Sequence, residues 1–426
     1  MSRRFARAIV HVGVEKTGTT SIQAFLASNV EALHQQGFAY PRTCGLPANL
    51  RLVVFSKECR RCEDLCRLIE LDSADAREGF LATFPGALAA EIEALPRSVH
   101  TLILSSEHFF SRLNEPAEIE RLRAVIAPLA ERMIIMIYLR RQDRLAVSRY
   151  TTLLYNGYRR ESPLPPPDAP RLLYDFDAGL NLWADAFGED AIVPRLFGES
   201  RQSSDIVGEF ARACGIDLRP GLVRPERLNR SLNPCAQALL RRLNQLGGHE
   251  KPVDPIARRL FHRLIGASCS GPGRLPSRAE AHEFLGRFAA GNERVRRRWL
   301  PEQARLFDEE FDHYPETADP EPPADEQADL LLALLLDTLG GETSLRAEIL
   351  YHKARAAHGK LKVTTALAQL RRALELDPGH EGAAKLLRRL EAPRAAPSDP
   401  GPRAPLAAAF RRLKRAARSV LRLRLS

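Results

Sequence analysis

The sequence lacks any apolar run close to the roughly 20 residues that a membrane-spanning helix needs. Its first apolar stretch, RAIVHVGV, runs straight into Lys16 without a small-residue cleavage pattern. We therefore expect a first core strand there rather than a signal peptide.

Cysteine is scarce and odd in number, seven in 426 residues. This usage indicates reduced thiols and a cytoplasmic protein.

Three of the cysteines, Cys59, Cys62 and Cys66, are closely spaced as CxxCxxxC. On a helix, positions i, i+3 and i+7 share one face, and cysteine is often a small buried hydrophobe there. No fourth ligand follows at a spacing typical of zinc sites. We therefore expect no metal site, with a bound metal or cluster as the alternative.

Acidic residues are missing from residues 401–426, which hold eight arginines and lysines. The formal net charge is +10, so the rest of the chain is only about +2. That charge does not indicate a nucleic-acid-binding protein. Apolar residues at 4-3-4-3 spacing predict a basic amphipathic helix over 406–426, suited to the anionic inner face of a membrane. A tail that is solvated or bound to a partner is the alternative. The apolar positions are Leu406, Phe410, Leu413, Ala417 and Val420.

Four short, β-rich apolar runs predict buried parallel strands, and amphipathic stretches such as 118–133 predict helices between them. This alternation predicts an α/β fold with a P-loop-type parallel sheet flanked by helices, followed by a small helical C-terminal region. Ligands of such sheets bind beyond the carboxyl ends of the strands. The predicted strands lie near 8–14, 100–106, 133–139 and 191–197.

Changes in composition predict the domain organisation. A Pro-rich loop at 155–172 is expected to be a lid or an acceptor-facing segment of the main domain. An acidic Pro-rich stretch and a Pro/Ala-rich stretch are both expected to be linkers. The predicted order is main domain, acidic linker, helical region, flexible linker and basic helix, at 1–314, 315–329, 330–391, 392–405 and 406–426.

Residues 350–387 resemble one tetratricopeptide repeat. Lys353 and Ala357 stand where apolar or aromatic residues are usual, so the match is partial. A lone repeat cannot bury its own face, so this segment is expected to pack on the main domain, a protein partner or a second protomer. A simple helical hairpin is the alternative. The matching positions are Leu350, Ala354, Ala366, Leu370, Ala373 and Pro378.

The segment HVGVEKTGTTSIQAFL, residues 11–26, predicts an anion-binding loop between a strand and a helix. A helix N-terminus offers unpaired N–H groups and a positive dipole end, Gly18 permits a tight turn, and Lys16 adds charge. In the nucleoside-triphosphate loop GxxxxGK[ST] the lysine follows the last glycine, but here it precedes Gly18 by two residues. We therefore expect a phosphate or sulfate site without Mg²⁺. A plain helix cap is the alternative.

This segment resembles the 5′-phosphosulfate loop of the P-loop sulfotransferases, which use 3′-phosphoadenosine 5′-phosphosulfate (PAPS). In that family an Arg after a strand and a Ser eight positions later bind the nucleotide 3′-phosphate. Here the run 133–139 is followed by Arg140 and Ser148, and Arg141 is the alternative if the register differs by one. The resemblance implies PAPS binding by Lys16, Thr17, Gly18, Thr19, Thr20, Ser21, Arg140 and Ser148.

The resemblance also implies a general base at the end of the run 100–106. Glu107 matches the base of glycan-modifying members and His108 that of other branches, while a helix cap at 105–107 is the alternative. LNRSLNPCAQALLRRLN, residues 228–244, resembles a helical segment of bacterial glycan-type members and contains Arg230 and Ser231, whose roles stay unassigned. The resemblance covers residues 7–312 and neither the repeat nor the basic tail.

The implied activity is metal-free, in-line transfer of a sulfuryl group from PAPS to a hydroxyl or amine of a saccharide or glycolipid. Lys16 would neutralise charge on the leaving phosphate, and Glu107 or His108 would take the acceptor proton. The alternatives are an ATP-dependent small-molecule kinase with an unusual loop and a catalytically inactive adaptor that binds proteins through its repeat. The sequence predicts no nucleic-acid partner.

Overall fold

The structure is a computed structural model, and it describes residues 3–58, 62–167, 172–198, 205–219, 221–225, 231–246, 255–340, 342–359 and 363–391. The predicted flexible linker, the basic helix, Cys59 and Arg230 lie outside these residues. The chain divides into two compact units, residues 1–340 and 341–426. In the part of the chain described, no helix combines the length and the apolar character that crossing a bilayer requires.

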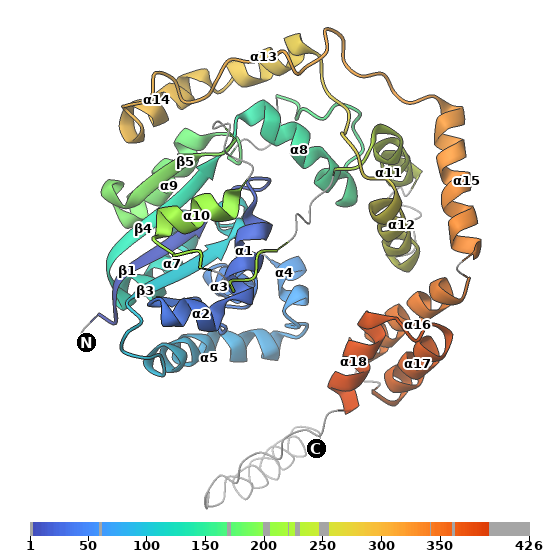
Figure 1. Cartoon of the computed structure of the whole chain (residues 1–426), viewed down its shortest axis with the longest axis horizontal. Coiled ribbons are helices and arrows are strands. Elements are labelled where there is room, and N and C mark those ends of the chain that lie inside the picture. Colours follow the sequence, from blue (N-terminus) through green and yellow to red (C-terminus); the bar gives the residue numbers. More distant parts are fainter. Residues whose placement is uncertain are drawn as a thin grey trace, which may run out of the picture. The chain divides into compact units, whose positions relative to one another are not determined.

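The first unit is built on one five-stranded, all-parallel sheet with the strand order β2-β3-β1-β4-β5 (Figure 1). The predicted α/β class and all four predicted strands are confirmed, and a two-residue edge strand is added. The strands are β1 (Phe5–Val12), β2 (Phe38–Ala39), β3 (Thr101–Ser106), β4 (Ala130–Leu139) and β5 (Ile192–Leu196).

Helices cover both faces of the sheet because successive strand residues point to opposite sides (Figure 1). Ile9 of β1 packs on one side with α1 (Thr19–Ser28), α2 (Val30–Gln35) and α10 (Ile206–Cys214). Ala8 and Val10 pack on the other side. The helices that contribute to this second core include α3 (Leu50–Ser56), α4 (Glu63–Leu68), α5 (Ala74–Glu93), α6 (Glu107–Arg112), α7 (Pro116–Ile126) and α9 (Phe176–Phe187).

The predicted helix at 118–133 is wrong at its C-terminal end. Helix α7 stops at Ile126, a short 3-10 turn spans Ala127–Leu129, and β4 begins at Ala130. Pro128 explains the early stop, because proline lacks an N–H donor and its ring clashes with the carbonyl four residues back. The last four residues of the predicted helix therefore belong to the sheet.

Helix α8 (Gln142–Tyr155) connects the sheet to a helical layer. Its Tyr150 and Leu154 form a separate core with α11 (Pro234–Leu246), α12 (Pro255–Ser268) and α15 (Ala324–Gly340). Two further helices, α13 (Arg278–Gly286) and α14 (Ala289–Trp299), precede α15.

The acidic linker predicted at 315–329 differs from the structure in two respects. Residues 324–329 form the first turns of α15, and the division between the two units falls at 340/341 instead. Before that helix, Glu321 forms ion pairs with Arg241 and Arg274, and Asp319 accepts a hydrogen bond from the Leu275 N–H. The carboxylates that suggest a solvated linker are therefore bound to arginines and backbone of the first unit.

Where the structure describes it, the second unit consists of α16 (Glu342–Gly359), α17 (Val363–Leu376) and α18 (Glu381–Glu391). Its core is made mostly of alanines, which allow helices to approach closely. Ala354, Ala366 and Ala373, three positions of the tetratricopeptide pattern, are fully buried. His380 caps α18, since its Nδ1 accepts the Ala383 N–H at 3.2 Å while its Nε2 lies 2.7 Å from Glu348 Oε2.

Candidate functional site

The loop between β1 and α1 has an unusual backbone. Lys16 and Gly18 have φ values of 63° and 77°, in the left-handed region. Gly18 adopts this conformation without a steric penalty, whereas a lysine seldom does. Arg140 donates from Nη1 to the Lys16 carbonyl oxygen at 2.7 Å and holds the strained peptide in place.

The loop leaves a row of backbone donors without acceptors. The N–H groups of Lys16, Thr17, Gly18 and Thr19 donate to no other residue among those described. Gly18 is the N-cap of α1 and provides no capping side chain. The positive end of the α1 dipole adds to these donors, so the loop has the character of an anion site.

Two threonine hydroxyls brace the loop. Thr17 Oγ1 donates to the Val14 carbonyl at 2.6 Å and is fully buried. Thr19 Oγ1 donates to Glu107 Oε2 at 2.9 Å and so connects the loop to α6. These two residues therefore offer a ligand their N–H groups while their hydroxyls fix the geometry.

Gly13, which sequence reasoning missed, allows this close approach. A Cβ at Gly13 would lie 2.4 Å from Thr19 Cγ2 and 3.0 Å from Glu107 Cα. Its N–H also donates to the Ser106 carbonyl at 3.0 Å, which extends the β1–β3 pairing. The signal available in the sequence was a lone glycine at the end of the strand in HVGVEK.

Glu107 and His108 lie at the first turn of α6. The capping role belongs to Ser106, whose side chain accepts the His108 N–H at 3.3 Å. Glu107 instead reaches across to Thr19 and keeps 32% of its side chain exposed. His108 Nε2 lies 3.9 Å from Glu107 Oε1, and burial lowers the pKa of His108 although Glu107 opposes the shift. The pair thus consists of an anchored, accessible carboxylate beside an imidazole that favours its neutral form.

Lys16 sits within a group of charges at the carboxyl ends of β1, β3 and β4. Burial lowers its pKa, while Glu107 and Glu15 act in the opposite direction. Arg140 is half-buried, and the loss of solvation lowers its pKa to about 10. Arg140 and Arg149 add positive potential around the Lys16 amine. The site is therefore net cationic and partly shielded from water, which strengthens its attraction for an anion.

The structure distinguishes Arg140 from Arg141. Arg140 reaches the loop and lies over the Phe197 ring, 5.5 Å from its centroid. Arg141 is fully buried and bonded to Asp143 and Asp308, so it anchors the start of α8. The alternative register that places Arg141 in the site has no support in these contacts.

Ser148 and Ser231 differ in their surroundings. Ser148 is half-buried on α8, and its hydroxyl makes no hydrogen bond within the described part of the chain. The Ser231 hydroxyl lies 3.3 Å from Thr151 Oγ1, and its carbonyl accepts the Gly271 N–H. Ser231 therefore helps to join α8 to the helical layer.

A cavity of about 500 Å³ adjoins the loop, and sequence reasoning missed two residues that line it. Glu15 immediately precedes Lys16, and Arg149 immediately follows Ser148. Arg149 Nε donates to Glu15 Oε2 at 2.6 Å, and Glu15 together with Tyr174 outweighs burial to raise the pKa of Arg149. The other walls come from α6 and the residue Asn114, from Leu153 of α8, and from the described part of the Pro-rich loop predicted at 155–172 with the two residues that follow it.

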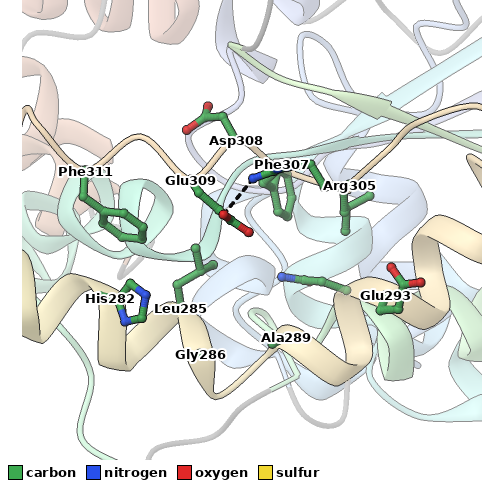
Figure 2. A pocket seen from close by; sticks show the side chains of 12 residues that line it. His282, Leu285, Gly286, Ala289, Glu293, Arg305, Phe307, Asp308, Glu309 and Phe311 are labelled. Carbon is green, nitrogen blue, oxygen red and sulfur yellow. Dashed lines mark ion pairs between the residues drawn. The ribbon is translucent and has the colours of Figure 1, made fainter.

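A second cavity, of about 310 Å³, lies between α13–α14 and residues 305–311 (Figure 2). Its charged side chains are already committed to one another or to neighbours. Figure 2, for example, marks the ion pair between Arg305 and Glu309 with a dashed line. The first cavity is the better candidate for a substrate site because Glu15 connects it to the anion loop. The pairs around the second cavity are Arg305–Glu309, Glu293–Arg296, Asp308–Arg144 and Asn292–Gln142.

Across the described ranges, no group of three or more His, Cys, Asp or Glu side chains is arranged to hold a metal ion. The Cys62 and Cys66 sulfurs lie 3.6 Å apart and are buried, Cys62 as the N-cap residue of α4 and Cys66 within that helix. No protein-family model, curated protein or solved structure matches the chain.

Proposed function

We propose that the chain is a PAPS-dependent sulfotransferase of the P-loop type and that it acts on a saccharide or glycolipid. The observation that carries the proposal is the row of four unpaired N–H groups at Lys16–Thr19, beside the Lys16 amine and the Glu107 carboxylate. An anion cradle and a carboxylate base at the same sheet edge are the two groups that sulfuryl transfer requires.

Arg140 supports nucleotide binding in the same site. A guanidinium has five N–H donors, and the Lys16 carbonyl accepts one of those of Arg140. The remaining donors make no hydrogen bond to another described residue, so they are available to a phosphate monoester such as the 3′-phosphate of PAPS. Ser148 follows on α8 with an unbonded hydroxyl.

The proposed reaction is an in-line displacement at sulfur. The acceptor oxygen forms a bond to sulfur while the bond from sulfur to the 5′-phosphate oxygen breaks. The electron pair of that bond leaves with adenosine 3′,5′-bisphosphate, and the acceptor proton passes to Glu107. Lys16 and the loop N–H groups stabilise the charge on the leaving phosphate. Thr19 holds Glu107 at a fixed orientation during the transfer.

Calorimetric titration with adenosine 3′,5′-bisphosphate and with ATP–Mg²⁺ tests the proposal. We expect the bisphosphate to bind in preference, and Arg140→Ala to weaken it about tenfold to a hundredfold, since a charged hydrogen bond is lost. Arg67→Ala, an exposed surface control paired with Glu63, should leave binding unchanged. Preferential binding of ATP–Mg²⁺ would favour the kinase alternative, and binding of neither ligand would refute both.

Two proposals concern the remainder of the chain. The basic segment 406–426 would attach the enzyme peripherally to the anionic inner face of a membrane, where lipid-bound acceptors are accessible. The helical unit would bind a protein partner as a tetratricopeptide-like module. Flotation with vesicles of anionic and of zwitterionic lipid tests the first, with a chain that ends at residue 405 as its control.

A further inference from the structure

The cavity beside the loop has two kinds of wall. The apolar part includes Phe110 of α6 and Tyr158 together with two prolines of the Pro-rich segment. The polar part includes Arg112 of α6 and Arg149 of α8. Its volume of about 500 Å³ lies within the usual range for small-molecule sites. Aromatic and proline rings can pack against the apolar face of a sugar, while guanidinium groups attract an anion.

The charges of the cavity are not balanced internally. Glu15 is the one carboxylate among the described lining residues, and it binds Arg149 through Nε alone. Arg112 uses Nη2 for Asp64, at 2.7 Å. The Arg149 guanidinium also interacts with the Tyr174 hydroxyl, and no other N–H of Arg112 donates to a residue that the structure describes. Several guanidinium donors therefore remain for a ligand.

Glu15 connects this cavity to the anion loop. It is covalently joined to Lys16, and both Glu15 and Arg149 act on the charge of the Lys16 amine. Ser111, another lining residue, donates to the Glu107 carbonyl at 3.1 Å from one turn further along α6. A group bound at Arg149 would therefore lie close to the proposed point of sulfuryl transfer.

We propose that the cavity binds a carboxylate-bearing sugar residue of the acceptor, with Arg149 and Arg112 as the groups that recognise the carboxylate. This inference rests on the proposed function and adds the class of acceptor. The carboxylate pairs with the open guanidinium donors, and the sugar ring packs on the partly exposed Tyr158 and on the two prolines. An arginine and a carboxylate match in geometry and charge, so they discriminate strongly against a neutral analogue.

The test uses oligosaccharides of alternating uronic acid and hexosamine, and the same oligosaccharides after reduction of each carboxyl group to CH₂OH. Binding is measured by calorimetry on the full chain saturated with adenosine 3′,5′-bisphosphate, and turnover with radiolabelled PAPS. We expect the carboxylated form to bind at least about tenfold more tightly, as one charged hydrogen bond provides. Arg149→Gln and Arg112→Gln should each reduce this preference while affecting the reduced form little.

Two controls keep the result interpretable. Arg123→Gln removes an exposed arginine that pairs with Glu120 on α7, outside the cavity, and should leave the preference intact. Glu15→Gln combined with Arg149→Gln avoids an unpaired Glu15 and should lose the preference as Arg149→Gln does. Equal binding of the two oligosaccharides, or a preference that survives both arginine substitutions, would overturn the inference. Binding of adenosine 3′,5′-bisphosphate is measured in the same samples. If the nucleotide binds, only the inference about the acceptor fails; if the nucleotide does not bind, the proposed function itself fails.

Discussion

At the scale of single residues, the site depends on one hydrogen bond between two elements that are far apart in the sequence. Thr19 Oγ1 of α1 holds the Glu107 carboxylate at the start of α6, and Gly13 leaves the space for it. The carboxylate is thereby kept from rotating away from the anion loop. Its orientation is a property of this contact and is not contained in the sequence pattern around Glu107.

Substitutions of Glu107 and of Thr19 distinguish the contribution of the proposed base from that of the residue that orients it. Glu107→Gln should lower kcat by about 10² to 10⁴, the usual contribution of a general base, while bisphosphate binding is retained. Thr19→Val should lower kcat less, because the base is present but poorly oriented, and Thr19→Ser should restore it. Steady-state turnover of radiolabelled PAPS checks both expectations. Full activity of Glu107→Gln would shift the role of base to His108.

His11 gives a pH dependence of stability. Burial lowers its pKa from 6.5 to about 3, so the folded chain does not take up the proton that the unfolded chain binds below pH 6.5. The corresponding stability is present above pH 6.5 and is lost as the pH falls towards 3. We expect wild type to lose about 1.4 kcal/mol per pH unit more than His11→Asn between pH 6 and 4.

Urea unfolding at several pH values measures this difference for His11. Asn offers a polar atom near the position of His11 Nδ1, which lies 2.8 Å from Ser105 Oγ, but it does not titrate. Parallel stability curves for the two proteins would contradict the prediction.

At the scale of elements, hydrophobic patterning predicted the four main strands because each is a short buried run with few polar interruptions. It failed at the end of α7, where Pro128 outweighs a helical apolar pattern. It also missed β2, since two residues are too few to show a period. The loop was predicted from its residue types and Arg140 from the family resemblance, but Arg149 and Glu15 meet across 134 residues, which no local pattern encodes.

The cap of α18 is a second feature that spacing did not show. His380 accepts the Ala383 N–H through Nδ1, so His380→Ala should destabilise the second unit by about 1 kcal/mol. His380→Asn should recover much of this loss, because asparagine is a good N-cap. Thermal unfolding followed by circular dichroism measures both variants. Equal stability of wild type and His380→Ala would show that the cap contributes nothing.

At the scale of the whole molecule, the two compact units have separate cores. The site described above is contained in residues 1–340, and the buried alanine core belongs to residues 341–426. The acidic segment before α15 is bound to arginines of the first unit. The division between the units at 340/341 therefore does not coincide with the change in composition at that segment.

A chain ending at Gly340 should therefore fold and bind adenosine 3′,5′-bisphosphate with the affinity of the full chain. The reason is that every residue of the proposed nucleotide site lies in the first unit. Calorimetric titration of the shortened and full chains checks this. A loss of affinity of tenfold or more, in a shortened chain that still unfolds cooperatively, would mean that the second unit contributes to the site.

The covalent bond between Glu15 and Lys16 has a consequence for kinetics. Glu15 lines the cavity and Lys16 belongs to the anion loop, so a shift of the peptide that joins them changes the geometry of both sites. Donor and acceptor would then bind with synergy, and thermodynamic reciprocity requires each to improve the affinity of the other by the same factor. In double-reciprocal plots of initial rate at varied concentrations of both substrates, the lines would intersect above the horizontal axis and to the left of the vertical axis. Independent binding would instead place the intersection on the horizontal axis.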